Sequence, residues 1–369
     1  MAKAILLQGK ETLDLAYAYD FYCNGNCNSY LFAIFIVQFD GIGLIAKYDI
    51  PQVVWSGKRH NLVRIGVTLE LMSKGDLVLK DADGTVAWST NTFAKSVVDL
   101  NLIDLGNLML FDKDNATIWQ SFDHPIDSLV LRKKLRQGQR LMLSVSETNW
   151  TVDSMIKLSV NGNGLFAQVE TNPPQRYVKS NGPSWNASIE FLYVEFVNGS
   201  LSRFSNSTSS WSLISIPQAS SAQYMKLGSN GHLTMYDWLY GFKEDLFKKY
   251  LNDCDYPTVC GQYEICSNGQ CSCPTSSWGM SYFQRVDDSR PNLGCSKNVP
   301  LSCGASQQQS LLELENVTYF SFTPNLEDID ASSCKEAYAK NVHAKQLHFS
   351  MNRIALAAVV TYQLMCFHL

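Results

Sequence analysis

Two stretches of the chain superpose in register: Gly75-Asp-Leu-Val-Leu-Lys-Asp-Ala-Asp-Gly-Thr-Val-Ala-Trp88-Ser and Gly106-Asn-Leu-Met-Leu-Phe-Asp-Lys-Asp-Asn-Ala-Thr-Ile-Trp119-Gln. Each contains a short strand, a polar turn and a second strand ending in the indole, which is the pattern of a β-hairpin. A degenerate copy runs from Tyr30 through a turn at Asp40 to Trp55. Such a unit cannot close its own core, so three of them predict a three-fold β-prism around the tryptophans. A generic β-sandwich is the alternative.

The β pattern continues beyond this repeat. Residues 155–169 predict two strands joined by a glycine-containing turn, residues 188–197 a partly alternating strand, and residues 225–236 a hairpin similar to those of the repeat. We therefore expect an all-β protein in which residues 150–245 form a second, more diverged copy of the first domain.

The composition favours a β-rich secreted protein over a helical cytosolic enzyme. Of the 369 residues, only 17% are charged and 12% are aromatic. The net charge of −4 argues against a nucleic-acid partner, which would require a basic face. No motif for a cofactor is present.

The cysteines are concentrated in one short segment. Six of the 11 lie within about forty residues, at Cys254, Cys260, Cys266, Cys271, Cys273 and Cys295. So short a segment cannot bury enough apolar surface to fold alone, which predicts a disulfide-stabilised module. Zinc is the rival interpretation, but the one-residue spacing of Cys271 and Cys273 suits tetrahedral ligation poorly, and no histidine lies among them.

N-glycosylation signals agree with an oxidising secretory route. Six sequons are present, at Asn115, Asn149, Asn186, Asn198, Asn206 and Asn316. The apolar stretch 4–7 is too short for a signal-peptide core. The stretch 30–37 is better interpreted as a buried strand than as a membrane span, and the stretch 354–367 is also short for a span, although it is a candidate weak anchor. We expect an extracellular or plasma-membrane-exterior location.

The chain resembles a known plant family at several segments: Trp55-Ser-Gly-Lys-Arg-His-Asn, Gly75-Asp-Leu-Val-Leu, Trp88-Ser-Thr-Asn and Trp119-Gln-Ser-Phe-Asp-His-Pro-Ile-Asp-Ser. These resemble the bulb-type (monocot mannose-binding) lectin domain, and more narrowly the G-type lectin S-receptor-like serine/threonine kinases. The segment from Cys254 to Pro274 resembles that family's EGF-like module, and Leu301-Ser-Cys303 resembles the start of its PAN/apple module.

The resemblance implies an order of modules. They are a bulb-type lectin domain of β-prism II fold at 15–145, a second one at 150–245, an EGF-like module at 254–296, a partial PAN module at 303–340 and a divergent tail at 341–369. It also implies the pairing Cys254–Cys266, Cys260–Cys271 and Cys273–Cys295, which spacing alone leaves open. Cys23 and Cys27 could close a small loop, Cys303 and Cys334 would belong to the PAN module, and Cys366 would remain unpaired.

The chain departs from the family at both ends. It has no recognisable signal peptide, and it has no Gly-rich phosphate loop, His-Arg-Asp loop or Asp-Phe-Gly triplet of a kinase. Family character is lost after about Lys340. We therefore expect no enzymatic activity from these residues, and we hypothesise a truncated or mis-spliced product or a faulty gene model.

The family's sugar motif is Gln-x-Asp-x-Asn-x-Val-x-Tyr, whose polar side chains would hydrogen-bond mannose from one face of a strand. In motif order, the positions are Met72, Lys74, Asp76, Val78 and Lys80 in one copy, Ile103, Leu105, Asn107, Met109 and Phe111 in the next, and Gly228, Asn230, His232, Thr234 and Tyr236 in the later domain. The degenerate candidates are Asp76, Val78, Asn107, Asn230 and Tyr236. Each lost partner should cost about 1–3 kcal/mol. Millimolar binding involves only about 4 kcal/mol, so we expect mannose binding to be lost.

Two other groups of polar residues have structural interpretations. Ser121, Asp123, His124 and Asp127 are too close in sequence for a catalytic triad, so we expect them to stabilise a corner after a strand. Asp81-Ala-Asp83-Gly84 resembles the start of a calcium loop but has no glutamate at its twelfth position, so we expect a hairpin turn and no metal.

Three functions remain in view. The first is a recognition module that binds a glycan, protein or peptide, alone or as a dimer with related receptors. The second is a fragment of a receptor kinase that signals by phosphorylation. The third is a mannose-binding defence lectin, which the decay of the sugar motif disfavours.

Overall fold

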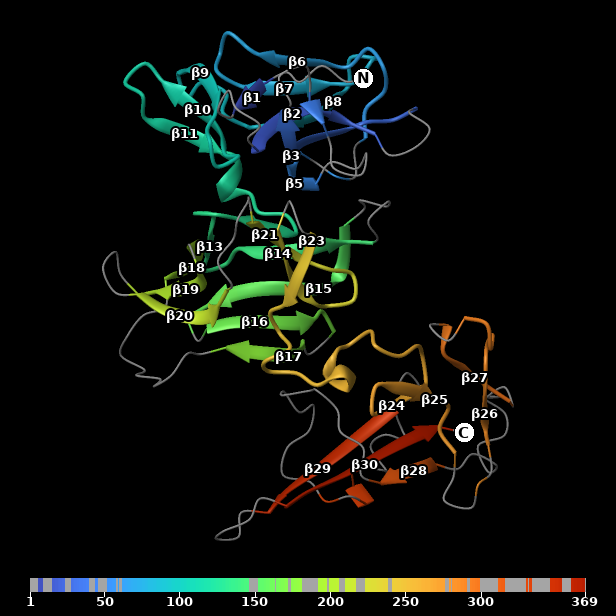
Figure 1. Cartoon of the computed structure of the whole chain (residues 1–369). Helices are drawn as coiled ribbons and strands as arrows, with labels where there is room; N and C mark the ends of the chain where they lie inside the picture. The colour runs from blue at the N-terminus through green and yellow to red at the C-terminus, as the bar shows by residue number, and fades with distance from the viewer. Residues whose placement is uncertain are drawn as a thin grey trace. The chain divides into compact units, whose positions relative to one another are not determined.

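In the computed structural model of this chain, almost all of the described regular secondary structure is β-strand (Figure 1), which confirms the prediction of an all-β protein. The structure describes residues 6–8, 15–23, 28–39, 44–45, 52–57, 59, 62–145, 152–162, 164–171, 174–180, 192–197, 199–205, 210–216, 223–237, 241–275, 279, 281–290, 293–298, 311–315, 330, 332–333, 346–353 and 360–368. The chain divides into two compact units, one of residues 1–170 and 178–249 and the other of residues 171–177 and 250–369.

Three antiparallel sheets form the N-terminal part of the first unit. The first contains β1 (Leu6–Gln8), β2 (Leu15–Tyr22), β3 (Leu31–Phe39), β4 (Leu44–Ile45) and β5 (Gln52–Ser56). The second contains β6 (Thr68–Leu71), β7 (Leu77–Lys80) and β8 (Val86–Ser89). The third contains β9 (Val97–Leu102), β10 (Leu108–Asp112) and β11 (Thr117–Gln120), followed by the 3-10 helix η2 (Ser121–Asp123).

The three sheets repeat one detail of strand pairing. In each, a tryptophan on the last strand lies opposite an apolar residue on the middle strand, and the register shifts immediately afterwards. The pairs are Trp55 with Ile34, Trp88 with Leu79, and Trp119 with Leu110. This equivalence identifies β3 and β5 as the first copy of the repeat. It also adds β2, which the sequence did not predict, as that copy's first strand.

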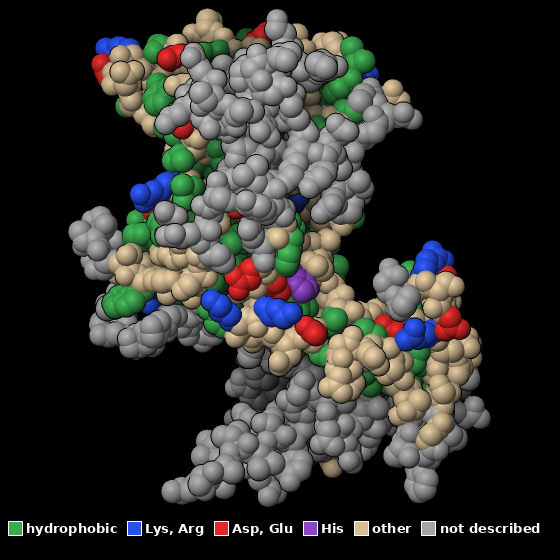
Figure 2. Space-filling model, viewed as in Figure 1, with side chains coloured by type: hydrophobic (Ala, Val, Ile, Leu, Met, Phe, Trp, Pro, Cys, Tyr) green, Lys and Arg blue, Asp and Glu red, His purple; other side chains and the backbone are tan. Residues whose placement is uncertain are grey.

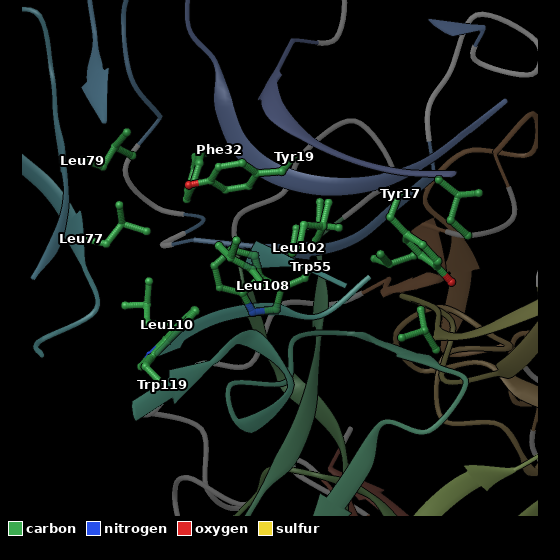
Figure 3. Close-up of a cluster of buried hydrophobic side chains, with 14 of the residues drawn as sticks. Tyr17, Tyr19, Phe32, Trp55, Leu77, Leu79, Leu102, Leu108, Leu110 and Trp119 are labelled. Carbon is green, nitrogen blue, oxygen red and sulfur yellow. The ribbon is translucent and has the colours of Figure 1, made fainter. Parts of the chain in front are cut away.

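The three tryptophans meet in the core. Their ring centroids are 5.8 Å (Trp55–Trp88), 5.9 Å (Trp55–Trp119) and 5.8 Å (Trp88–Trp119) apart, each pair edge to face. This geometry is favourable for aromatic rings because it brings a positive edge against a negative face. Figure 3 shows apolar side chains from the surrounding strands converging on the same cluster. The expectation that the tryptophans meet centrally is confirmed.

The glycine that opens each hairpin is required by its surroundings. Gly75 and Gly106 have φ values of 88° and 77°, which favour glycine. A Cβ atom at Gly106 would lie 2.4 Å from the Tyr17 ring, and one at Gly75 would lie 2.9 Å from the Val97 amide nitrogen. Each turn therefore approaches a neighbouring strand too closely for a side chain.

Three further sheets have four strands each. They are β12 (Ser128–Val130), β21 (Gln223–Leu227), β22 (Leu233–Asp237) and β23 (Gly241–Asp245); β13 (Lys134–Arg136), β18 (Tyr193–Val197), β19 (Ser200–Phe204) and β20 (Ser210–Ser215); and β14 (Arg140–Ser144), β15 (Val152–Asn161), β16 (Gly164–Val169) and β17 (Gln175–Ser180). The hairpins predicted over residues 155–169 and 225–236 are β15–β16 and β21–β22.

The second unit contains the remaining strands. They are β24 (Ile265–Ser267) with β25 (Gln270–Ser272), β26 (Phe283–Arg285) with β27 (Cys295–Lys297), and β28 (Leu311–Glu315), β30 (Val360–His368) and β29 (Gln346–Arg353) in one sheet. The 3-10 helix η3 (Asp253–Asp255) precedes them. Three disulfides join Cys254 to Cys266, Cys260 to Cys271 and Cys273 to Cys295, which are the pairs that the resemblance implies.

Candidate functional site

The three copies of the candidate sugar motif contain the same kind of turn. The amide of Met72 donates to the carbonyl of Asp76, and the amide of Gly75 donates to the carbonyl of Met72. The same two bonds recur at Ile103, Asn107 and Gly106, and at Gly228, His232 and Gly231. The five motif positions therefore do not share one strand face, which corrects that expectation, because the first two lie in the turn.

Asp76, at the motif's Asn position, faces the protein. Its Oδ1 accepts hydrogen bonds from the Thr90 hydroxyl (2.8 Å) and the Thr92 amide (3.0 Å). The Thr90 hydroxyl in turn lies 2.7 Å from that of Thr92. Asp76 thus ties the turn before β7 to the chain that follows β8, and this oxygen is engaged within the protein.

The other two copies contain the same kind of tie. Oδ1 of the buried Asn107 accepts from the Ser121 hydroxyl and the Phe122 amide, both at 3.1 Å. Nδ1 of His232 lies 2.7 Å from Oδ2 of Asp245, at the end of β23. In each copy, the third motif position has a hydrogen bond to residues at the end of the second strand that follows it or just beyond that strand.

Several of the remaining motif positions also have packing or pairing roles. Val78 is buried, and the ammonium of Lys80, at the Tyr position, pairs with Glu70 at 2.9 Å. Tyr236 stacks on Tyr224 with ring centroids 5.1 Å apart and packs against the tryptophan core. Asn230 is exposed, and its Oδ1 accepts from the His232 amide at 3.3 Å.

The polar corner after Trp119 has the structural role expected from its sequence. The His124 ring stacks on Trp119 at 5.2 Å, and burial lowers the pKa of His124. Asp123 accepts from Gln120 at 2.9 Å and pairs with Arg136. Ser121 and Asp127 bond to other partners, so these side chains form no catalytic relay.

Asp127 belongs to a buried charge network that the sequence did not predict. Its Oδ1 lies 2.9 Å from the guanidinium of Arg59, and both side chains are at most 4% exposed. Arg59 also donates to the Ser144 hydroxyl at 2.5 Å. Although burial opposes it, the charges of Arg59 and Lys226 contribute to an Asp127 pKa below the usual range. The network ties the loop after β5 to β12 and β14.

Lys133 is the other buried charge near Asp127. Its ammonium donates to the Ser128 carbonyl at 3.0 Å, and burial lowers its pKa to about 7. Lys133 stands between two other basic residues, which gives no sign of burial. The available signal was its position two residues before the buried Leu135, because alternate residues of an extended chain lie on the same face.

The acidic hairpin turn after β7 is an ion-paired turn. Arg64 pairs with Asp81 at 2.7 Å and with Asp83 at 2.5 Å. Hydrogen bonds from Thr85 and Arg64 lower the pKa of Asp83 to about 2. The guanidinium of Arg64 thus pairs with the carboxylates that a calcium ion would need as ligands.

Several predicted positions fall outside the described residues. They are Cys27, Cys303 and Cys334 and the sequons at Asn149, Asn186, Asn198, Asn206 and Asn316. Cys23 is disulfide-bonded. Asn115 is exposed, with a φ of 60° in the turn between β10 and β11, where a glycan could be accommodated.

Charged side chains on the face shown in Figure 2 gather in small groups of mixed sign. Among the described residues, no helix has the length and apolar character needed to cross a membrane.

Comparison with known proteins gives a consistent family. The sequence profile described as D-mannose binding lectin matches residues 52–151. A G-type lectin S-receptor-like serine/threonine-protein kinase of Arabidopsis thaliana is 29% identical over 80% of this chain and 35% of its own length. EP1-like glycoprotein 2 of Arabidopsis thaliana is 29% identical over 69% of this chain and 65% of its own.

The epidermis-specific secreted glycoprotein EP1 of Daucus carota is 31% identical over 64% of this chain and 71% of its own length. Among solved structures, the two-domain, fetuin-binding Scilla campanulata agglutinin matches 61% of this chain and 90% of its own, with 16% identity and a TM-score of 0.22. The chain thus spans about a third of the kinase and about two thirds of the EP1-like glycoprotein.

Proposed function

Because the chain belongs to the plant family of D-mannose binding lectin-domain proteins that includes glycoprotein EP1, we propose that it is an extracellular recognition region that does not bind free mannose. One observation supports the statement that the chain does not bind free mannose. The third motif position is engaged within the protein in all three copies, through Asp76, Asn107 and His232.

The energetic argument is direct. A sugar hydroxyl that approached Asp76 or Asn107 would have to displace protein hydrogen bonds worth about 1 kcal/mol each. Those bonds also connect each hairpin to the following chain, so their loss would loosen the fold. The ligand is therefore a glycan with other contacts or a protein or peptide, bound by one chain or by a dimer with a related receptor.

The proposed architecture is two β-prism II lectin domains at 15–145 and 150–245, an EGF-like module at 254–296 and a partial PAN module at 303–340. The three-fold tryptophan cluster supports the first domain. The turn at 228–232, which matches those at 72–76 and 103–107, supports the second. The three disulfides support the EGF-like module.

A second candidate is the recognition half of a receptor kinase. The kinase relative aligns over 80% of this chain, which favours it. Phosphorylation would be performed by a domain outside the aligned third of that relative, and in this case too, the residues described above would act in recognition.

The test of recognition is a glycan and peptide array probed with the full chain secreted from eukaryotic cells. We expect no signal on mannose or high-mannose glycans and a signal on at least one other ligand class. Binding to mannose that Asp76→Ala and Asn107→Ala abolish would overturn the proposal, because these side chains would then contact sugar.

The secretory route has a separate test. The mass of the non-reduced protein before and after glycosidase should show attached N-glycans and oxidised cysteines. An unglycosylated chain whose thiols react freely with a maleimide reagent would contradict an extracellular location.

A further inference from the structure

The loop that follows β8 exposes an aromatic ring beside an unpaired cation. Phe93 is 61% exposed, and the Lys74 ammonium lies 5.1 Å from the centre of its ring. Within the part of the chain that the structure describes, the Lys74 ammonium has no carboxylate partner. In contrast, the ammonium of Lys80 is neutralised by Glu70. Lys74 therefore retains a charge that can meet a ligand.

The backbone holds this arrangement in place. Asn91, Ala94 and Ser96 have φ values of 55°, 62° and 57°, a conformation that non-glycine residues adopt at an energetic cost. The Ala94 amide donates to the Lys74 carbonyl at 2.8 Å. The buried Thr92 hydroxyl donates to the Gly75 carbonyl at 2.8 Å. The loop and the turn that bear the two side chains are thus joined on both sides of Phe93.

The next copy of the repeat lacks both features. The residue equivalent to Phe93 is His124, whose ring stacks on Trp119 and is therefore engaged within the protein. The residue equivalent to Lys74 is Leu105. The exposed pair is therefore a property of one copy, and the repeat does not require it for folding.

We propose that Lys74 and Phe93 form a binding site for an acidic saccharide, such as a uronic-acid oligomer. The Phe93 ring would cover the apolar face of one sugar, and Lys74 would pair with its carboxylate. Lys95, exposed on the same loop, adds a second positive charge for a neighbouring residue of the oligomer. This inference rests on the proposed recognition function and names its ligand class.

The chemistry favours an acidic sugar over a neutral one. In the family motif, the position of Lys74 is an aspartate, so the charge offered to the ligand has changed sign. An exposed cation beside an aromatic face attracts an anion through Lys74 and sugar C–H groups through Phe93. Attraction that depends on exposed charge should weaken as salt screens it.

The test is titration calorimetry of the full chain with oligogalacturonate, the neutral oligogalactose of the same length and polyglutamate. We expect binding to oligogalacturonate alone, weaker at high salt. Lys74→Leu, which installs the residue of the next copy, and Phe93→Ala should each weaken binding about tenfold. Lys113→Leu, which removes an equal charge from the turn between β10 and β11, should leave binding unchanged.

Each alternative outcome is decisive. Equal binding of polyglutamate, or equal loss in Lys113→Leu, would mean general attraction to anions and overturn the saccharide site. Absence of oligogalacturonate binding would overturn it as well. The array described above separates the two proposals, because a signal on other ligands would leave the recognition function standing.

Discussion

The tryptophan-centred sheets and the cysteine module are stabilised by different means. In the sheets of residues 15–130, the strands bury a continuous apolar cluster around Trp55, Trp88 and Trp119. Among the described residues of 251–298, the buried apolar side chains are Tyr256, Pro274, Phe283 and the disulfide-bonded Cys295. The module has three disulfides in about forty residues. Apolar burial thus stabilises the first region, whereas covalent cross-links stabilise the second.

The largest expected effect comes from the cross-links. Replacing the six module cysteines with serine removes three loop closures, each worth about 3 kcal/mol. We expect residues 254–297 to unfold while residues 62–145 stay folded. Hydrogen exchange followed by mass spectrometry should then show full exchange in the module and unchanged protection in β7 and β10. Loss of protection in both regions would contradict their separate stabilisation.

The converse variant is Trp55→Ala. It removes the buried indole at one corner of the aromatic triangle and should destabilise the first unit by about 3–5 kcal/mol. The module's exchange should not change. Trp211→Ala is the matched control, because that indole is 43% exposed and buries less of its surface than Trp55, which is 3% exposed. Equal destabilisation by both variants, measured by urea unfolding, would rule out the triangle as the core.

The buried pair of Arg59 and Asp127 should have the next largest effect. Arg59→Met leaves the Asp127 carboxylate buried without its cation, which costs about 3–5 kcal/mol. The double variant Arg59→Met/Asp127→Leu should recover most of this loss, because apolar residues can replace a buried ion pair. Urea unfolding of the single and double variants measures the difference. If the double variant is as unstable as Arg59→Met, then the hydrogen bonds of Ser144 and Ser128 require the charged side chains.

A smaller effect is expected at the turn-to-strand tie. Asn107→Ala removes the acceptor of the Ser121 hydroxyl and the Phe122 amide and should cost about 1–3 kcal/mol. Asn101→Ala, on the exposed side of β9, should change stability by less than about 0.5 kcal/mol. Thermal unfolding of both variants checks this. A neutral Asn107→Ala would undermine the argument that this position was diverted from sugar binding to structure.

The sequence predicted the repeat because its signals are local. The Gly-Asp-Leu-Val-Leu and Gly-Asn-Leu-Met-Leu strands, the polar turns and the tryptophan spacing all fall within one hairpin. The first strand of the first copy, β2, was missed because a loop separates it in sequence from its partner β3, and β5, the strand that carries Trp55, is further away still. The alignment of Met72, Ile103 and Gly228 agrees with their shared turn hydrogen bonds.

The candidate site was only partly predictable for the same reason. Loss of the motif was evident from residue types, but the inward hydrogen bonds of Asp76 and Asn107 depend on residues 14 to 16 positions later. The sequence did not predict that Phe93 is exposed beside Lys74, because this depends on a loop in which residues other than glycine adopt the left-handed backbone conformation. The pairing of Arg59 with Asp127 joins positions 68 residues apart, which no local pattern reports.

The last effect should appear as a dependence on pH. Burial lowers the pKa of Lys133 to about 7, whereas the unfolded chain has the ordinary lysine value of 10.5. Between these values, the unfolded chain binds a proton that the folded chain has released, so stability rises with pH, by at most about 1.4 kcal/mol per pH unit. Below pH 7, both states are protonated and the penalty for burying the charge is fully present. Lys133→Met should therefore flatten the rise in the free energy of unfolding between pH 7 and pH 9, whereas the exposed Lys113→Met should preserve it. An equally steep rise in Lys133→Met would assign the pH dependence to other groups and leave Lys133 charged in the folded protein, neutralised by Asp127.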